Sequence, residues 1–275
     1  MNTSSPSPSE IEKIWRRYDE DELRLTAALS ERMLERGDAG SKLRILDIAT
    51  GRGEPAIRAA QMTQQGMVVG IDSAAAMLKM AQERASREGV TNLQLLEADA
   101  MELPPLPFHD FDLALCRWGL MYFSDPKKTL AWVRKVFSIQ PGNWWRPFGR
   151  ALTAFPIFTT LENYWRTTYP FHRMNMKALQ RFDMPKSNAF TAISKRKDGR
   201  IDSIEEMEVD VMEARTDHEL VAWVRAFGLN RLTQHLSNEL QQAWERDLIE
   251  QSQNYKKGTS YYLGGVTRIV VASPG

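Results

Sequence analysis

Acidic side chains follow apolar runs at three places in the first third of the sequence, and the first of them opens a glycine-containing loop. Asp47 lies in "ILDIATGRGEPA", which also supplies Gly51 and Gly53. Glycine has no Cβ atom, so a ligand can approach the backbone closely at these positions. Asp72 ends the run "MVVGID", and Asp99 follows "LQLLEA". The sequence therefore predicts a binding site in which three carboxylates meet a bare backbone loop.

Two classes of ligand are compatible with this loop. Residues 51–56 read G-x-G-x-x-A, which partly matches the dinucleotide pattern that places a pyrophosphate at a helix N-terminus. Two residues argue against a dinucleotide, because Glu54 would put a negative charge beside the pyrophosphate and Asp47 would have no role. The Asp47 carboxylate instead suits a ligand with a cationic amino group. Asp72 can accept both hydroxyls of a ribose, which either ligand contains.

Asp99 distinguishes the two classes better. It is followed by Ala100 and Met101 in "EADAMELP". A carboxylate can accept a hydrogen bond from the exocyclic amine of adenine while apolar neighbours cover the ring. Together with Asp47 and Asp72, Asp99 predicts a pocket for an amino acid joined to ribose and adenine.

Short apolar runs position these acids, and helical patterns separate the runs. Strands alternating with helices at this spacing predict right-handed β-α-β units and a mostly parallel sheet with helices on both faces. In such a sheet, ligands bind at the carboxyl ends of the strands. The predicted strands are Leu43–Ala49, Met67–Asp72, Leu93–Asp99 and Phe111–Gly119.

Other parts of the chain surround this half. A helix is predicted from Glu10 to about Arg36, capped by Ser9, with a break near Asp19 left open. The aromatic- and proline-rich segment that begins at Trp144 predicts a lid rather than sheet. A strand, two amphipathic helices and a final strand with a glycine bend follow it. We expect an N-terminal helical cap (1–36), a cofactor-binding half (37–143), a lid (144–200) and a C-terminal part that completes the sheet (201–275).

Five motifs, taken in order, resemble those of the class I S-adenosylmethionine-dependent methyltransferases: "LDIATGRGEPA", "VVGIDSAAAML", "EADAMELP", "FDLALCRWGLMYFSDP" and "VRKVFSIQPG". The similarity covers about Ile45–Pro141 and is greatest to the branch that contains the ubiquinone/menaquinone C-methyltransferases and related small-molecule enzymes. It implies a Rossmann-like, mostly parallel seven-stranded sheet and S-adenosylmethionine as the cofactor. It also implies methyl transfer by direct displacement to carbon or oxygen of a small acceptor.

The resemblance implies a role for each residue at the strand ends. Asp47 and the backbone of Ala49–Gly53 would face the methionine part, Asp72 the ribose, and Asp99 with Ala100 the adenine. The backbone of Cys116 and Arg117 would contact the methionine amino group, and Tyr18 resembles an N-terminal tyrosine that closes over the cofactor. Helical spacing also places Met77 with Met80 in the core. The expected cofactor-binding residues are Tyr18, Asp47, Ala49, Thr50, Gly51, Gly53, Asp72, Ser73, Met77, Asp99, Ala100, Met101, Cys116 and Arg117.

The acceptor side departs from the family pattern. An apolar fifth strand usually follows Gly142, but this chain has "NWWRPFGRALTAFP", so the strand is either shifted to about Arg150–Phe158 or altered. Trp118, Tyr122 and Tyr169 are the expected substrate contacts. His172 is the one histidine placed where a general base could meet a substrate. The aromatic lid predicts a mainly apolar or aromatic acceptor, through Phe148, Phe155, Phe158, Tyr164, Trp165, Tyr169 and Phe171.

The composition narrows the partners. With 36 basic and 35 acidic residues, no strongly basic face is forced, so nucleic acid and anionic membranes are not expected partners. The single cysteine, Cys116, excludes an intrachain disulfide, and no sequence pattern indicates a metal site. We expect a cytoplasmic protein, and homo-oligomerisation through the N-terminal helix or the lid remains open. An NAD-dependent oxidoreductase and a non-catalytic cofactor-binding protein remain the alternative functions.

Overall fold

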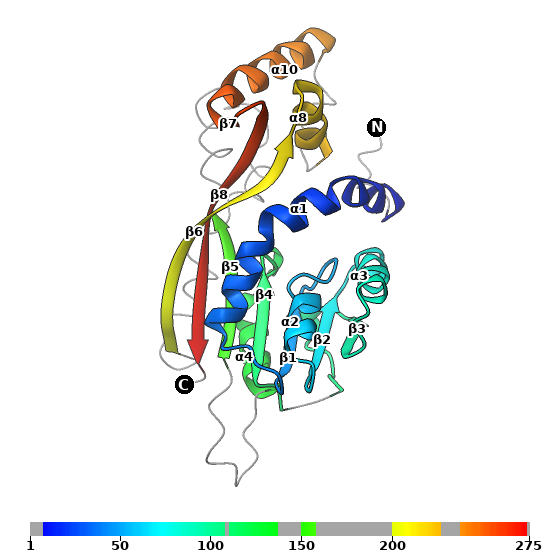
Figure 1. Cartoon of the computed structure of the whole chain (residues 1–275), viewed down its shortest axis with the longest axis vertical. Helices are drawn as coiled ribbons and strands as arrows, with labels where there is room; N and C mark the ends of the chain where they lie inside the picture. Colours follow the sequence, from blue (N-terminus) through cyan, green and yellow to red (C-terminus); the bar gives the residue numbers. More distant parts are fainter. Residues whose placement is uncertain (1–7, 108–109, 137–149, 158–199, 227–236, 274–275) are drawn as a thin grey trace. The chain divides into compact units, whose positions relative to one another are not determined.

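The computed structural model describes residues 8–107, 110–136, 150–157, 200–226 and 237–273 (Figure 1). Its central element is one sheet with the strand order β3-β2-β1-β4-β5-β8-β6, and β7 pairs with β8. The pairs β1–β2, β1–β4, β2–β3 and β4–β5 are all parallel. The strands are β1 (Arg44–Ile48), β2 (Met67–Asp72), β3 (Leu93–Glu97), β4 (Leu113–Arg117), β5 (Arg150–Ile157), β6 (Arg200–Ala214), β7 (Lys256–Lys257) and β8 (Ser260–Ser273).

The described helices agree closely with the predicted ones. One correction concerns the first helix, α1, which begins at Pro8 and runs unbroken to Arg36. Ser9 therefore lies inside its first turn instead of capping it, and no break occurs near Asp19. The others are α2 (Ala56–Met62), α3 (Ala75–Arg87), α4 (Pro126–Val136), α8 (Asp217–Val224) and α10 (Asn238–Ser252), with short 3-10 turns η1 (Ala100–Glu102), η2 (Leu120–Tyr122) and η4 (Gln253–Tyr255).

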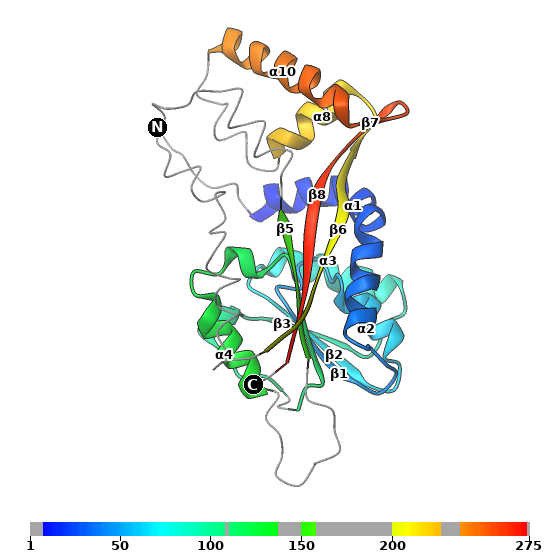
Figure 2. The same ribbon diagram turned by 90° about the vertical axis from the view of Figure 1, so that its left-hand side faces the viewer.

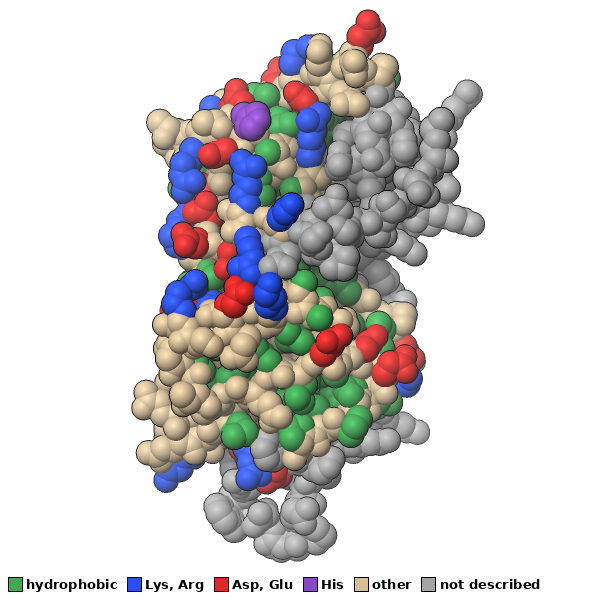
Figure 3. Space-filling view, turned by 90° about the vertical axis from the view of Figure 1, so that its right-hand side faces the viewer, with side chains coloured by type: hydrophobic (Ala, Val, Ile, Leu, Met, Phe, Trp, Pro, Cys, Tyr) green, Lys and Arg blue, Asp and Glu red, His purple; other side chains and the backbone are tan. Residues whose placement is uncertain are grey.

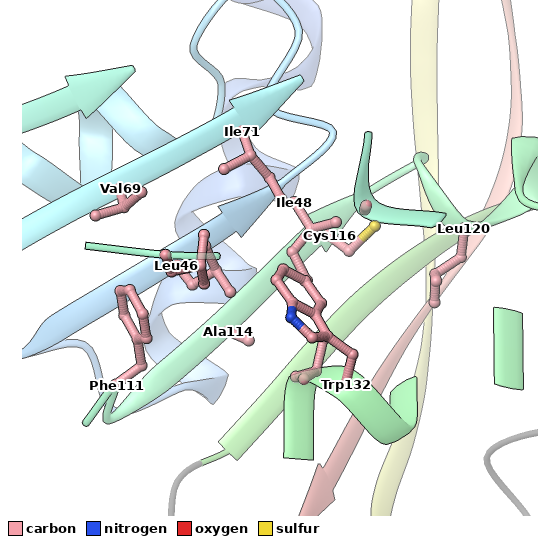
Figure 4. Close-up of a cluster of buried hydrophobic side chains, with 12 residues drawn as sticks. Leu46, Ile48, Val69, Ile71, Phe111, Ala114, Cys116, Leu120 and Trp132 are labelled. Carbon is pink, nitrogen blue, oxygen red and sulfur yellow. The ribbon is translucent and has the colours of Figure 1, made fainter. Parts of the chain in front are cut away.

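Helices cover both faces of the parallel strands, as continuous apolar runs require (Figure 2). On one face, Trp132 and Val133 of α4 pack against Leu46, Ile48 and their neighbours in a cluster of buried side chains (Figure 4). On the other face, buried side chains of α2 and α3 complete the core; they are Ala56, Ile57, Ala59, Ala60, Leu78, Met80 and Ala81. Met80 is therefore a core residue as predicted, whereas Met77 is only half-buried.

Strand β5 lies within the expected lid, so this described part of the lid proves to be sheet. Arg150–Ala154 of β5 pair in parallel with Leu113–Arg117 of β4. This position agrees with the expected shift of the strand to about residue 150. The partner strand β4 belongs to the core, because its first four residues are buried. Because partner strands supply hydrogen bonds from outside the segment, weak alternation within residues 150–157 did not prevent strand formation.

The chain divides into two compact units. The second unit contains Ala28–Ile157, Thr267 onward and the part of β6 up to Met207; the first contains the earlier part of α1 and Glu208–Val266. The first unit has its own core, built around Trp244 and Tyr261, which are both 1% exposed. In this core, the hydroxyl of Tyr261 donates to Asp217 and accepts from Gln253.

Basic and acidic side chains are interspersed on the face shown in Figure 3, as expected from the near-zero net charge. Among the described residues, α1 forms ion pairs with β6, such as Arg32 with Glu205 at 2.8 Å. Among the described helices, none is long and apolar enough to cross a membrane.

Candidate functional site

The predicted site residues of the second unit come together because their strands are neighbours. β3, β2, β1 and β4 are adjacent and parallel, so their carboxyl ends share one edge of the sheet. Asp47 and the glycine loop belong to the end of β1, Asp72 to β2 and Asp99 to the segment after β3. Cys116 and Arg117 end β4. This shared edge, at the carboxyl ends of open α/β strands, is where ligands bind in such folds.

The glycine loop, residues 49–53, is held in a defined conformation by backbone hydrogen bonds. The Thr50 N–H donates to the Ile71 carbonyl oxygen at 2.9 Å, and the Gly53 N–H donates to Thr50 at 2.9 Å. Gly51 and Gly53 have φ values of 56° and 86°, in the left-handed region that glycine adopts without steric cost. Ala49 also has a positive φ, 55°. A small side chain at that position keeps the strain modest.

Asp47 is completely buried beneath this loop. Its Oδ2 atom accepts a hydrogen bond from the Thr50 hydroxyl at 2.7 Å. Its Oδ1 atom is buried and has no hydrogen-bond partner in the described part of the protein. Burial raises the pKa of Asp47 from its usual 3.8 to about 7, against the lowering effects of Thr50 and Arg117. An orphaned, buried carboxylate oxygen is costly unless a ligand or solvent group donates to it.

Asp72 and Asp99 each cap the local backbone with part of their carboxylate. Asp72 Oδ2 accepts from the Gly51 N–H at 2.8 Å, and Oδ1 accepts from the Ala74 N–H at 2.9 Å. Asp99 Oδ1 accepts from the Met101 N–H at 2.8 Å and so begins η1. An ionised carboxylate has about four acceptor positions. Both acids therefore combine a capping role with remaining capacity to accept from a ligand.

The end of β4 is closely packed against the end of β1. A Cβ atom on Gly119 would lie 2.5 Å from the Ala49 Cβ and 2.8 Å from the Cys116 sulfur, so only glycine fits. Trp118 has a φ of 59°, a strained value for a large side chain, and its ring lies 5.0 Å from the Arg117 guanidinium. The Trp118 Nε1 atom is buried without a hydrogen-bond partner among the described residues. Backbone strain of this kind often accompanies function.

The expected argument from Glu54 against a dinucleotide is wrong. Glu54 is 4% exposed, and its carboxylate pairs with Arg84 at 2.9 Å and Arg58 at 3.1 Å. Burial alone would raise the pKa of Glu54, but Arg117, Arg84 and Arg58 together lower it. The negative charge is thus compensated inside the protein and would not repel a pyrophosphate. Discrimination between ligand classes depends instead on Asp47 and Asp99.

Three contacts of Met101, made by Ser124 and Lys128, were missed from the sequence. The backbone N–H and the hydroxyl of Ser124 both lie 3.3 Å from the Met101 sulfur, and the Lys128 ammonium donates to the Met101 carbonyl oxygen at 3.1 Å. These contacts join η1 to the segment before α4 and to the first turn of α4. They depend on tertiary proximity, and no local pattern in the sequence could have indicated them.

The remaining predicted residues fall in three groups. Ser73 is exposed, Met77 is half-buried and Tyr122 is 74% exposed, all in the second unit. Tyr18 belongs to the first unit, where burial raises its pKa, opposed by Arg17 and assisted by Glu219. His172 and Tyr169 lie outside the described residues. Within the described ranges, His, Cys, Asp and Glu side chains do not gather in a group of three or more that could hold a metal ion.

Comparison with known proteins shows a similarity for the part of the chain that contains the shared edge. Residues 39–142 match the family model of a methyltransferase domain. These residues contain the glycine loop and all the carboxylates of the shared edge. This part of the chain is therefore similar to methyltransferase domains, as the sequence motifs predicted, and it has a Rossmann-like α/β fold.

Two curated relatives and one solved structure show the extent of the similarity. Over 115 residues the chain is 31% identical to the aklanonic acid methyltransferase DauC of a Streptomyces species, covering 42% of this chain and 52% of DauC. Over 95 residues it is 37% identical to the demethylmenaquinone methyltransferase of Thermus thermophilus, covering 34% and 42% respectively. The matches thus span about half or less of these relatives' own length.

The solved structure extends the likeness of the fold beyond the matched domain. The YcgJ protein of Bacillus subtilis superposes with a TM-score of 0.52 at 18% identity, over 89% of this chain and 97% of that one. DauC and the Thermus enzyme are both named as methyltransferases, so neither supports the oxidoreductase alternative.

Proposed function

We propose that this protein is an S-adenosylmethionine-dependent methyltransferase that modifies carbon or oxygen of a small acceptor. One observation carries the proposal: Asp47, Asp72 and Asp99 stand at the carboxyl ends of three adjacent parallel strands, around a glycine loop of the part that is similar to methyltransferase domains. The orphaned Oδ1 atom of Asp47 fits a ligand with an ammonium group, which S-adenosylmethionine has and NAD lacks at that position.

Each carboxylate would bind a different part of the cofactor. Asp47 would accept from the ammonium group, with the loop backbone beside the methionine part. Asp72, already oriented by Gly51, would accept from the ribose hydroxyls. Asp99 would accept from the adenine amine, with Ala100 and Met101 against the ring. When bound, the cofactor supplies a methyl group on a sulfonium, which is electrophilic enough to need little further activation.

The protein's own contribution to methyl transfer is mainly positioning and the exclusion of water. Trp118 follows the end of β4 and stays the leading proposal for an acceptor contact, together with Tyr122 and Tyr169. His172 stays a proposal for a general base, which an electron-rich acceptor would not require. The named substrates of DauC and of the Thermus enzyme, aklanonic acid and demethylmenaquinone, support an aromatic or prenylated acceptor for this chain.

The chain's charge supports a small-molecule partner rather than nucleic acid, because 36 basic and 35 acidic residues nearly balance. A cytoplasmic location and a homodimer are further proposals. Cell fractionation and light scattering of the purified protein test them directly.

Calorimetric titration tests the cofactor assignment. The purified protein is titrated with S-adenosylmethionine, S-adenosylhomocysteine and NAD, with the Asp72→Ala variant beside the wild type. We expect both sulfur ligands to bind, the variant to lose this binding and NAD to give no heat. Binding of NAD alone would overturn the proposal. Binding without methyl transfer to any of a panel of quinones, polyketides and indoles would favour a cofactor-binding protein without catalysis.

A further inference from the structure

A cluster of buried charges lies directly behind the glycine loop. Glu54 follows Gly53 in the chain, and its two carboxylate oxygens contact different helices. Oε2 pairs with the Arg84 guanidinium of α3 at 2.9 Å, and Oε1 pairs with Arg58 of α2 at 3.1 Å. The Glu54 side chain is 2% exposed and that of Arg84 is 9% exposed. Ion pairs so well shielded from water are not weakened by solvent in the way that surface pairs are.

The same face of α3 touches the loop at a second point. A Cβ atom on Gly53 would lie 3.2 Å from the Ala81 Cβ, which places the Gly53 backbone against α3. Ala81 and Arg84 are three residues apart in this helix, so they lie on one face. The glycine loop is therefore fixed to α3 by a backbone contact at Gly53 and by an ion pair at the next residue.

Arg84 has a second acidic partner at the end of α3. Its Nε atom donates to Glu88, one turn later in the chain, at 2.7 Å. One guanidinium thus links the end of α3 with the buried end of the loop. Arg117 of β4 also acts on Glu54 electrostatically, and it acts on Asp47 in the same way. The charges that compensate Glu54 therefore come from three elements around the loop.

We propose that Arg84 is a positioning residue, which holds the glycine loop in its ligand-binding conformation through the Glu54 ion pair. This inference depends on the proposed function, because it assigns Arg84 a part in binding the methionine portion of the cofactor. Arg84 acts on the loop through Glu54, and the loop backbone meets the ligand.

The choice of ligand separates positioning from general stability. S-adenosylhomocysteine has the amino acid portion that would face the loop, whereas 5′-methylthioadenosine lacks it and retains adenine, ribose and a 5′-methylthio group. A loosened loop should weaken binding of the first ligand more than binding of the second, because only the first ligand has a portion that would face the loop. General destabilisation of the domain would weaken binding of both ligands to the same extent.

The test compares Arg84→Met, Arg84→Lys and Glu88→Gln with the wild type by calorimetry. We expect Arg84→Met to weaken S-adenosylhomocysteine binding about tenfold, or about 1.4 kcal/mol, and 5′-methylthioadenosine binding by less than about threefold. Arg84→Lys, which keeps a positive charge opposite Glu54, should stay within about threefold of the wild type. Glu88→Gln is the matched control, because it removes the other charged partner of Arg84, and it should bind both ligands as the wild type does. Equal weakening of both ligands, or no weakening of either, would overturn the inference.

Hydrogen exchange gives a second measurement that needs no ligand. In Arg84→Met, amides of residues 50–54 should exchange at least about threefold faster, whereas amides of β3 should be unchanged. If the wild type binds neither ligand, the proposed function fails. The positioning role is then tested by hydrogen exchange alone, and loop exchange in Arg84→Met equal to that of the wild type would overturn it. If Arg84→Met does not fold, the same comparison is made with Arg84→Lys. In that variant, hydrogen exchange in the loop equal to the wild type, together with weaker binding of both ligands, would overturn the positioning role of Arg84.

Discussion

The Oδ2 atom of Asp72 accepts a hydrogen bond from the backbone N–H of Gly51 across 2.8 Å. This contact joins the carboxyl end of β2 to the glycine loop that follows β1. The residue expected to bind the ribose therefore also helps to hold the loop expected to face the methionine part. Two portions of one ligand would thus be recognised by structurally coupled groups.

Replacing Asp72 should therefore affect more than the ribose contact. We expect Asp72→Ala to weaken S-adenosylhomocysteine binding by at least about a hundredfold, since charge-assisted hydrogen bonds contribute about 1.5–3 kcal/mol each. Asp72→Asn keeps one carbonyl oxygen as an acceptor and should lose less. Calorimetry measures both affinities. An Asp72→Ala variant that binds as the wild type does would contradict a ligand-binding role for this carboxylate.

The raised pKa of Asp47, about 7, predicts a pH dependence of both stability and binding. The folded protein holds a proton on Asp47 that the unfolded chain releases near pH 3.8, so this group's contribution to stability falls as the pH rises from about 4 through 7. A ligand ammonium would favour the ionised form. We therefore expect S-adenosylhomocysteine to bind more tightly at about pH 8 than at about pH 6, with a proton released on binding below pH 7.

Calorimetry in two buffers of different ionisation enthalpy measures that proton. Asp47→Asn should abolish both the proton release and the pH dependence. Glu54 and Arg117 act on Asp47 electrostatically; the pKa of Glu54 is lowered by the arginines around it, and burial lowers the pKa of Arg117. Persistence of the pH dependence in Asp47→Asn would assign it to another group.

Two glycines provide a matched pair for testing the loop backbone. Gly51 and Gly89 have φ values of 56° and 69°, and an added Cβ would meet nothing within 4 Å at either. Alanine at either position should cost about 1–2 kcal/mol of unfolding free energy through the left-handed backbone alone. Only Gly51→Ala should also weaken S-adenosylhomocysteine binding, because its methyl group would project from the loop expected to face the ligand. Chemical denaturation measures the effect on stability, and calorimetry measures the effect on binding. Equal binding by both variants would show that the ligand does not contact the loop at Gly51.

Trp118 can be tested for a role on the acceptor side. Trp118→Phe keeps an aromatic ring and removes an indole N–H that has no partner among the described residues. Unfolding stability should change by less than about 1 kcal/mol, and cofactor affinity should be unchanged. The kcat/KM for an acceptor found by screening should fall about tenfold, the effect of losing roughly one hydrogen bond to substrate. If cofactor affinity falls instead, Trp118 contacts the cofactor and not the acceptor.

The sequence predicted the parallel half of the fold well because its signals are local. Strand β2 occupies the predicted residues, and Pro55 directly precedes α2. Continuous apolar runs between helical patterns indicate buried strands without knowledge of their partners. Strand β5 was harder, because "RALTAFPI" begins with an arginine and contains a proline, and its pairing with β4 supplies the missing information.

The site was predictable in its residue types but not in its internal contacts. Strand-end position identified Asp47, Asp72 and Asp99, because the topology brings strand ends to one edge. The charge of Glu54 was misjudged, since its neutralisation depends on Arg84, which lies thirty residues later in the chain. Such pairs between separate elements leave no mark in local sequence spacing.

The single thiol of the chain gives this domain a built-in kinetic reporter. Cys116 is 4% exposed and belongs to the buried cluster beneath the shared edge. A thiol reagent can reach it only when the end of β4 separates from its neighbours, so the labelling rate measures that local opening. With no other cysteine in the sequence, the reaction has no background. Any ligand bound at this edge would register as slower labelling, whatever its chemical identity.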